Sequence, residues 1–214
     1  CEKAAPALLA GMPVLTKPAT SSALVAARLV EIVLEKQLLP EGALSLLLGA
    51  AGDLLTHVGP QDVVAFTGSS ETGVAIRSLP QVIRQAVRVN VEADSLNAAV
   101  LGPDVEPGSE TWDLFLKDVL RDMTQKAGQK CTAIRRVLVP EPLAEALREE
   151  LIARLEQVVV GNPASEGVRM GPLATRQQHD DVRAGIDALA RDGRLVYGRP
   201  DLRPVGVEPG RGPG

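Results

Sequence analysis

Hydrophobic and polar positions alternate along the first 92 residues in a way that predicts both strands and helices. Short apolar runs at residues 13–17, 43–48, 62–66 and 87–92 predict four strands. Between these runs, apolar side chains recur at roughly helical spacing over residues 24–33, and residues 53–57 and 69–77 predict two further helices. Strands that alternate with helices are typical of an α/β fold.

Beyond Ser95 the pattern changes to fewer strands and longer helices. Residues 98–101 and 136–139 predict strands, whereas residues 143–159 and 175–190 predict helices. A further helix precedes Cys131, and its apolar face is formed by Trp112, Phe115, Leu116, Val119, Leu120 and Met123. We therefore place a domain boundary near Asp94, with residues 1–94 in one domain and residues 95–214 in a second, and we expect Trp112 in the core.

Composition and charge exclude several classes of function. The 214 residues are 45% hydrophobic and 23% charged, which is ordinary for a soluble globular protein with one large or two small domains. The net charge of −4 is spread over interspersed acids and bases, so we expect no nucleic-acid or membrane partner. The sequence contains no apolar stretch of the ~20 residues that span a bilayer and no initial signal segment.

The cysteines and histidines bear on disulfide bonds, cellular location and metal binding. The only cysteines are Cys1 and Cys131, so a disulfide framework is implausible and a cytoplasmic location is expected. His57 and His179 lack metal-ligand spacing with Asp, Glu or Cys, and we predict surface positions and no metal site.

The two ends of the sequence predict a fragment of a longer protein. The chain begins without Met in a stretch that is typical of the middle of a helix. It finishes in the turn-rich residues 209–214 without a closing element.

Cys131 carries the main chemical hypothesis. A lone cysteine is most often a small buried apolar residue. Here the polar Gln129 and Lys130 precede it at a break after a helix, which suits a thiol that must be reached and kept partly ionised. The residues alone leave both alternatives open, a structural cysteine and a nucleophile.

Glu92 is the candidate acid or base. It ends the predicted strand 87–92, where a salt bridge to Arg88 or Lys130 would be a structural explanation. The functional alternative is a general base that activates water to hydrolyse a thioester. Open α/β sheets bind ligands at strand ends, which favours the base.

Residues 66–73 predict a strand, a tight turn and a helix. The N-terminus of such a helix offers free N–H groups to an anion such as a pyrophosphate. This signal is weak alone, because strand-Gly-Ser-helix turns are also common as simple caps and the Gly-x-Gly-x-x-Gly fingerprint is absent. Lys17, at another strand end, is equally well explained as a solvated terminus.

Together, these segments resemble the core of an aldehyde dehydrogenase in their order and spacing. The resemblance runs from Cys1 to about Tyr197 and rests on residues 17–20, 66–69, 92, 128–131, 159–163 and 170–173. It implies an aldehyde dehydrogenase fold in which residues 1–94 form a partial Rossmann-like nucleotide-binding domain. Residues 95–214 would form a partial α/β catalytic domain that carries the cysteine.

The resemblance also implies roles for individual residues. Cys131 would be the nucleophile and Glu92 the base. The implied cofactor contacts are Lys17, Ala19, Thr20, Phe66, Gly68, Ser69 and Gln178. At the position of Thr20, NAD-preferring members commonly carry a glutamate that holds the ribose hydroxyls and would repel a 2′-phosphate. Thr20 with Lys17 nearby would accept that phosphate, so we predict NADP over NAD.

One departure from the family pattern indicates a branch. Most members follow the glutamate with Leu-Gly-Gly-Lys, whereas here Ala93-Asp94-Ser95-Leu96-Asn97 follows it. With residues 127–136, this resembles dehydrogenases of ring-opened, CoA-linked semialdehydes from aerobic benzoate breakdown. The alternative is the dehydrogenase half of a bifunctional phenylacetate-degradation protein.

The resemblance therefore implies an NADP-dependent oxidation of such a semialdehyde to an acid, through a thioester on Cys131, by a homo-oligomer. CoA-acylating relatives and acyl-phosphate reductases generally lack the glutamate, so Glu92 argues against both. A non-catalytic fragment that only binds a nucleotide is the alternative from a different class. The oxyanion-hole asparagine is expected before Cys1, and the segment that holds the nicotinamide ribose after Gly214. The 214 residues alone are therefore expected to be inactive.

Overall fold

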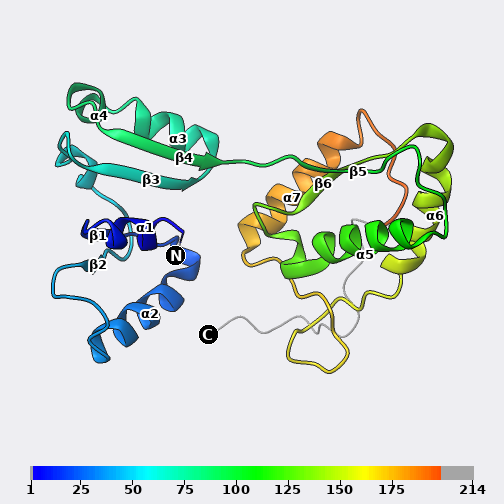
Figure 1. Ribbon diagram of the computed structural model, residues 1–214, viewed down its shortest axis with the longest axis horizontal. Helices are drawn as coiled ribbons and strands as arrows, with labels where there is room; N and C mark the ends of the chain where they lie inside the picture. Colours follow the sequence, from blue (N-terminus) through cyan, green and yellow to red (C-terminus); the bar gives the residue numbers. More distant parts are fainter. Residues whose placement is uncertain (1, 199–214) are drawn as a thin grey trace. The chain divides into compact units, whose positions relative to one another are not determined.

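The computed structural model describes residues 2–198 (Figure 1). The chain divides into two compact units, Cys1–Asp94 and Ser95–Gly214, and each is considered by itself. Both units mix helices with parallel strand pairs, as the α/β pattern predicts. The turn-rich stretch predicted at residues 209–214 lies outside the described residues.

The first unit is built on two separate pairs of parallel strands. Strand β1 (Val14–Thr16) pairs with β2 (Leu44–Leu46), and β3 (Val63–Gly68) pairs with β4 (Arg88–Ala93). The helical elements are α1 (Ala4–Leu9), η1 (Thr20–Ser22), α2 (Ala23–Glu35), η2 (Leu54–Thr56), α3 (Ser70–Arg77) and α4 (Pro80–Arg84). The four predicted strands are present, and β1 and β2 are shorter than their predictions.

Local chemistry explains how α3 follows β3 and packs on β4. The Ser69 hydroxyl accepts the Thr72 N–H at 3.3 Å and caps the helix. Gly73, on the buried side of α3, lies so close to β4 that an added Cβ would come 2.5 Å from Cγ1 of Val91. A glycine at this point lets helix and strand approach closely, which fixes the β3–α3–β4 unit.

The second unit packs two helices over a further parallel pair. Strand β5 (Asn97–Val100) pairs with β6 (Ile134–Leu138), with a register shift between Asn97 and Ala98. The helical elements are α5 (Glu110–Thr124), η3 (Gln125–Gly128), η4 (Glu141–Leu143), α6 (Ala144–Leu155) and α7 (Arg176–Leu189). The predicted helix over residues 143–159 is shorter in the structure, since α6 ends at Leu155.

Helices α5 and α6 enclose the core of the second unit. Trp112, Leu116 and Leu147 are buried together with Leu101, and the Trp112 indole N–H donates to Glu150 at 3.0 Å. The prediction that Trp112 lies in the core is confirmed. Met123, predicted on the same face, is 37% exposed because it lies in the last turn of the helix.

Two further features concern ions and membranes. His57 and His179 are both exposed, as predicted. Over residues 2–198, no three His, Cys, Asp or Glu side chains are grouped so that they could hold a metal ion. In the same range, every helix is too short or too polar to cross a bilayer.

Candidate functional site

Glu92 lies at the carboxyl edge of the β3–β4 pair. The parallel register places Glu92 beside Thr67 and Ala93 beside Gly68, and Ser69 follows directly as the cap of α3. The predicted base and the predicted phosphate-binding turn therefore share one edge of one strand pair. This is the edge at which parallel α/β sheets bind ligands.

Glu92 forms an ion pair with a residue that the sequence did not single out. Its carboxylate accepts from Lys3 Nζ at 2.7 Å, across 89 positions of sequence, whereas Arg88 and Lys130 were the partners named for the structural alternative. Lys130 Nζ donates to Asp122 at 2.6 Å. The Glu92 side chain remains 53% exposed. Exposed pairs of this kind contribute little free energy, about 0–1 kcal/mol, so the carboxylate stays available to solvent.

The Phe66 ring packs against the backbone of Gly68 at the same edge. A Cβ at Gly68 would lie 2.4 Å from the Phe66 ring, so only glycine leaves room for the ring in this position. Beyond it, the Ser70 and Glu71 N–H groups at the start of α3 have no acceptor among residues 2–198. The turn thus presents open backbone and free N–H donors.

Lys17, Ala19 and Thr20 follow the carboxyl end of β1 and are all exposed. Among residues 2–198, the Lys17 ammonium group donates one hydrogen bond, to the Pro18 carbonyl at 3.1 Å. Within the described part of the chain, no hydrogen bond joins this segment to residues 66–69. The two predicted cofactor segments are therefore on separate strand pairs.

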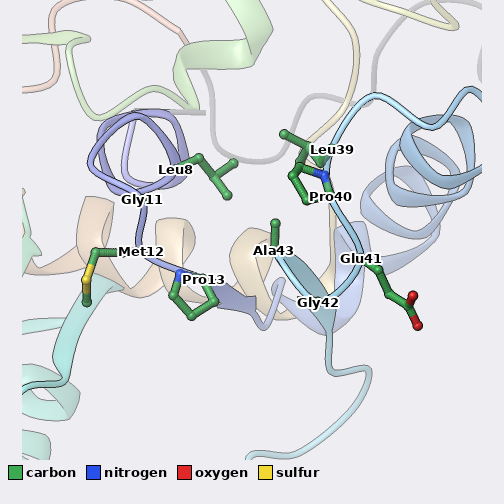
Figure 2. A pocket seen from close by; sticks show the side chains of 9 residues that line it. All are labelled: Leu8, Gly11, Met12, Pro13, Leu39, Pro40, Glu41, Gly42 and Ala43. Atoms are coloured by element: carbon green, nitrogen blue, oxygen red, sulfur yellow. The ribbon is translucent and has the colours of Figure 1, made fainter.

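A hollow in the first unit lies at the opposite ends of β1 and β2 (Figure 2). Leu8, Pro13, Pro40 and Ala43 line it, and Pro13 and Ala43 directly precede the two strands. Because ligands of parallel sheets bind at the carboxyl ends of strands, this hollow is not the expected cofactor site.

Cys131 lies on an exposed turn between η3 and β6. The structural alternative, a buried apolar cysteine, is therefore wrong. The neighbouring N–H groups of Lys130 and Ala133 donate to backbone carbonyls, whereas the Cys131 N–H finds no acceptor in the described residues. An exposed thiol beside a free amide N–H is an arrangement that can attack a carbonyl and hold the resulting oxyanion.

The backbone before Cys131 is strained. Lys126, Ala127 and Gly128 take φ values of 54°, 53° and 70°, the left-handed region that disfavours residues with a Cβ. Arg135 fastens this turn, because its guanidinium donates to the Gly128 carbonyl at 3.0 Å and to the Lys130 carbonyl at 3.3 Å. Strain of this kind persists only where surrounding contacts determine the conformation.

Asp122 holds both flanks of the cysteine from helix α5. Its carboxylate accepts from Lys130 Nζ at 2.6 Å and from the Ile134 N–H at 2.8 Å. The hydrogen bond from Lys130, followed by that from Ile134, lowers the pKa of the Asp122 carboxyl, against a smaller opposing effect of burial. The carboxylate is therefore charged at neutral pH and fixes the turn from both sides.

Two more side chains grip Cys131 through its own carbonyl. Ser95 donates its hydroxyl to the Cys131 oxygen, and Asn97 donates its amide to the same oxygen at 2.7 Å. Sequence reasoning assigned no role to Ser95, Asn97 or Asp122. A partial signal was the departure from Leu-Gly-Gly-Lys, which puts a hydroxyl where the family has a glycine.

Gln178 lies in the first turn of α7, where its N–H is capped by the Thr175 hydroxyl at 3.1 Å. The segment before this helix is tied to the cysteine turn, because the Ala174 N–H donates to Gln129 at 2.9 Å. The structure thus brings α7 towards the predicted nucleophile. The cofactor contact of Gln178 stays a prediction.

Comparison with known proteins supplies the family. A sequence profile described as the aldehyde dehydrogenase family matches residues 1–210. The chain is 49% identical over 208 residues to 3,4-dehydroadipyl-CoA semialdehyde dehydrogenase of Aromatoleum evansii, covering 97% of this chain and 40% of that protein.

Solved structures agree with this match. Betaine aldehyde dehydrogenase of Staphylococcus aureus in complex with NAD+ superposes with a TM-score of 0.81 at 27% identity, over 94% of this chain and 39% of that chain. An aldehyde dehydrogenase of Bartonella henselae gives a TM-score of 0.80 at 27% identity, over 96% and 42%. The chain spans about 40% of the length of these relatives.

Proposed function

The chain belongs to the aldehyde dehydrogenase family, and on that premise we propose that the protein oxidises a CoA-linked semialdehyde to a carboxylic acid with a nicotinamide cofactor. The observation that carries the proposal is the Cys131 turn, which presents an exposed thiol and a free N–H on a backbone gripped by several side chains. A nucleophile and an oxyanion donor on one residue are what acyl chemistry requires.

Cys131 performs the covalent step. Its thiolate attacks the aldehyde carbon, and the Cys131 N–H donates to the oxygen that becomes negatively charged. A bound nicotinamide cofactor would supply the acceptor for the hydride on the former aldehyde carbon, and Cys131 would then carry the acyl group as a thioester. Removal of one oxyanion donor typically lowers the rate by about 10²–10³.

Glu92 completes the cycle as the base. Its carboxylate takes a proton from water, and the hydroxide attacks the thioester carbon and releases the acid and the Cys131 thiol. The exposed position of Glu92 at a strand end leaves it open to water. A base at this point favours hydrolysis over transfer of the acyl group to CoA, the reaction of relatives that generally lack the glutamate.

The residues at the edge of β3 fit a dinucleotide. Gly68 leaves open backbone against the Phe66 ring, and the free N–H groups at the start of α3 suit a pyrophosphate. Lys17, Ala19 and Thr20 would hold the adenosine ribose, and Gln178 would contact the cofactor from α7. Betaine aldehyde dehydrogenase, similar in structure, was solved in complex with NAD+.

For this chain we propose NADP as the preferred cofactor. Thr20 is exposed and uncharged, and the ammonium group of Lys17 is free of any carboxylate in the described residues. A 2′-phosphate would gain a charge-assisted hydrogen bond there, whereas a glutamate at position 20 would repel it.

The 49% identity to 3,4-dehydroadipyl-CoA semialdehyde dehydrogenase favours a semialdehyde from aerobic benzoate breakdown. The phenylacetate intermediate is the second candidate, through the residues 92–97 that both branches share. A cytoplasmic homo-oligomer is part of the same proposal.

The test measures reduction of NADP and of NAD by the intact protein with a CoA-linked semialdehyde. We expect turnover with a lower KM for NADP than for NAD, and a reversed preference in Thr20→Glu. Absence of reduction with either cofactor would leave only the non-catalytic nucleotide-binding alternative. An unchanged preference in Thr20→Glu would contradict the NADP proposal alone.

A further inference from the structure

The main-chain carbonyl of Cys131 accepts hydrogen bonds from two side chains of one distant segment. Ser95 donates its hydroxyl and Asn97 donates its amide, at 2.7 Å, from positions 36 and 34 residues away in sequence. The same Asn97 amide also lies 3.0 Å from the carbonyl of Ala133. We call Ser95 and Asn97 the carbonyl clamp.

The start of strand β5 is built to aim Asn97 at this turn. The β5–β6 pairing shifts register between Asn97 and Ala98, so Asn97 faces Ile134 while Ala98 faces Arg136. Register breaks of this kind redirect a side chain, and they are over-represented beside active sites. Arg136 in turn donates to the Leu96 carbonyl, which fixes the segment between the two clamp residues.

The clamp restricts the thiol because the carbonyl and the side chain of Cys131 share one Cα. Fixing the oxygen fixes the peptide plane between Cys131 and Thr132 and removes rotation about ψ of Cys131. Three left-handed residues, Lys126 to Gly128, precede this point, and a strained turn relaxes if its contacts are removed. A clamp on the carbonyl therefore holds both the thiol and the free N–H in one arrangement.

We propose that Ser95 and Asn97 are positioning residues for the nucleophile, an inference that rests on the proposed function of Cys131. Ser95 stands where the common Leu-Gly-Gly-Lys pattern has its second glycine. Glycine has no side-chain donor, so members that keep this glycine cannot make the hydroxyl hydrogen bond to the carbonyl of the cysteine.

The variants are chosen by hydrogen-bonding capacity. Ser95→Ala and Asn97→Ala each remove donors, Ser95→Thr keeps the hydroxyl, and Asn97→Asp keeps the shape but turns an oxygen towards two carbonyls. Ser109→Ala is the matched control, since the Ser109 hydroxyl caps α5 by accepting the Trp112 N–H at 3.3 Å and makes no other hydrogen bond in the part of the chain that the structure describes. It removes one hydrogen bond of a serine far from the cysteine turn.

Two readouts on the intact protein separate positioning from general stability. The first is hydrogen–deuterium exchange of the peptide covering residues 129–134, which needs neither cofactor nor turnover. The second is the rate of the first turnover at saturating substrate, compared with KM for the cofactor. Each lost hydrogen bond is expected to change these rates about threefold to tenfold.

The clamp predicts faster exchange of residues 129–134 and a slower first turnover in Ser95→Ala and Asn97→Ala, with KM for the cofactor within about twofold of wild type. Asn97→Asp should show the largest loss, and Ser95→Thr should restore wild-type behaviour. Exchange that is unchanged in the clamp variants, or a loss of rate no greater than in Ser109→Ala, would overturn the proposal.

Failure of the proposed function has a different signature. If wild type shows no cofactor reduction, the dehydrogenase proposal fails, and the exchange measurement alone decides whether the clamp holds the turn. If wild type turns over and the clamp variants match it in both readouts, the positioning role of Ser95 and Asn97 is wrong and the dehydrogenase proposal is unaffected.

Discussion

Asp122 offers the sharpest test of how the cysteine turn is held. Its carboxylate binds both flanks of Cys131, through Lys130 Nζ at 2.6 Å and the Ile134 N–H at 2.8 Å. The side chains of Lys130 and Asp122 are only 12% and 21% exposed, so water screens the pair weakly. Replacement of Asp122 should therefore affect stability and the turn together.

The magnitude follows from what each variant leaves behind. Asp122→Ala removes the acceptor of the Ile134 N–H and the counter-ion of Lys130, and we expect a loss of about 2–3 kcal/mol in the free energy of unfolding. Asp122→Asn keeps an acceptor oxygen for the N–H and loses only the charge, which should cost about 1–2 kcal/mol.

Asp118→Ala is the matched control on the same helix. Asp118 pairs with Arg121 at 3.0 Å, and their side chains are 59% and 65% exposed. An exposed pair at this spacing contributes less than about 0.5 kcal/mol. The two aspartates therefore share a helix and a charge, and they differ in burial and in the backbone contact.

The effect of Asp122 should depend on pH in one direction. The hydrogen bonds from Lys130 and Ile134 lower the folded-state pKa of Asp122 below its ordinary value of 3.8. Its contribution is therefore complete above that pH and is lost as the pH falls through the lower folded-state pKa. The stability difference between wild type and Asp122→Asn should be full at pH 7 and should shrink below about pH 4.

Urea unfolding of the intact protein measures these differences, at pH 7 and at steps down to pH 3. Hydrogen–deuterium exchange of residues 129–134 reports the turn itself. A loss in Asp122→Ala no larger than in Asp118→Ala would refute the assigned role of the carboxylate. A difference between wild type and Asp122→Asn that stays constant with pH would do the same.

Three further predictions use urea unfolding at pH 7. Gly73→Ala should lower the free energy of unfolding by up to about 2 kcal/mol, because the new Cβ would lie 2.5 Å from Val91 and the cost of overpacking exceeds the gain in helix propensity. If the losses in Gly73→Ala and Val91→Ala simply add in the double variant, the two residues are not in contact. Asp94 has a φ of 51°, so Asp94→Val should lower the free energy of unfolding by about 1–2 kcal/mol, whereas Asp94→Gly should stay within about 1 kcal/mol of wild type. Equal stabilities of the two variants would contradict a left-handed backbone at this position. Lys3→Ala should change stability by less than about 0.5 kcal/mol, since the Glu92 carboxylate is largely solvated; a loss above 1 kcal/mol would mean a buried pair.

Sequence patterns predicted the elements in which buried apolar side chains and exposed polar side chains alternate with a clear period. The apolar runs before Glu92 and the face around Trp112 are long enough to give a clear period, and both β4 and α5 are found in the structure. Helix α4 was missed because its five residues contain little more than one turn, although Pro80 at its first position was a signal.

The contacts around the candidate site could not be read in the same way. Lys3 and Glu92 are 89 positions apart in the sequence, and Ser95 and Asn97 are 36 and 34 positions from Cys131. Local sequence patterns cannot predict contacts over such separations. The left-handed turn at residues 126–128 was also missed, because Lys126 and Ala127 have no preference for that conformation. The motifs predicted candidate site residues, and tertiary contacts determine what holds those residues in place.

The proposed mechanism requires that Cys131 forms a thioester and that Glu92 activates the water that hydrolyses it. The most direct measurement is the mass of the Cys131 peptide from the intact Glu92→Gln protein after incubation with NADP and a CoA-linked semialdehyde. We expect one acyl group on Cys131, with one equivalent of reduced cofactor released in a burst and little turnover afterwards. An unmodified Cys131, or undiminished steady turnover in Glu92→Gln, would contradict it.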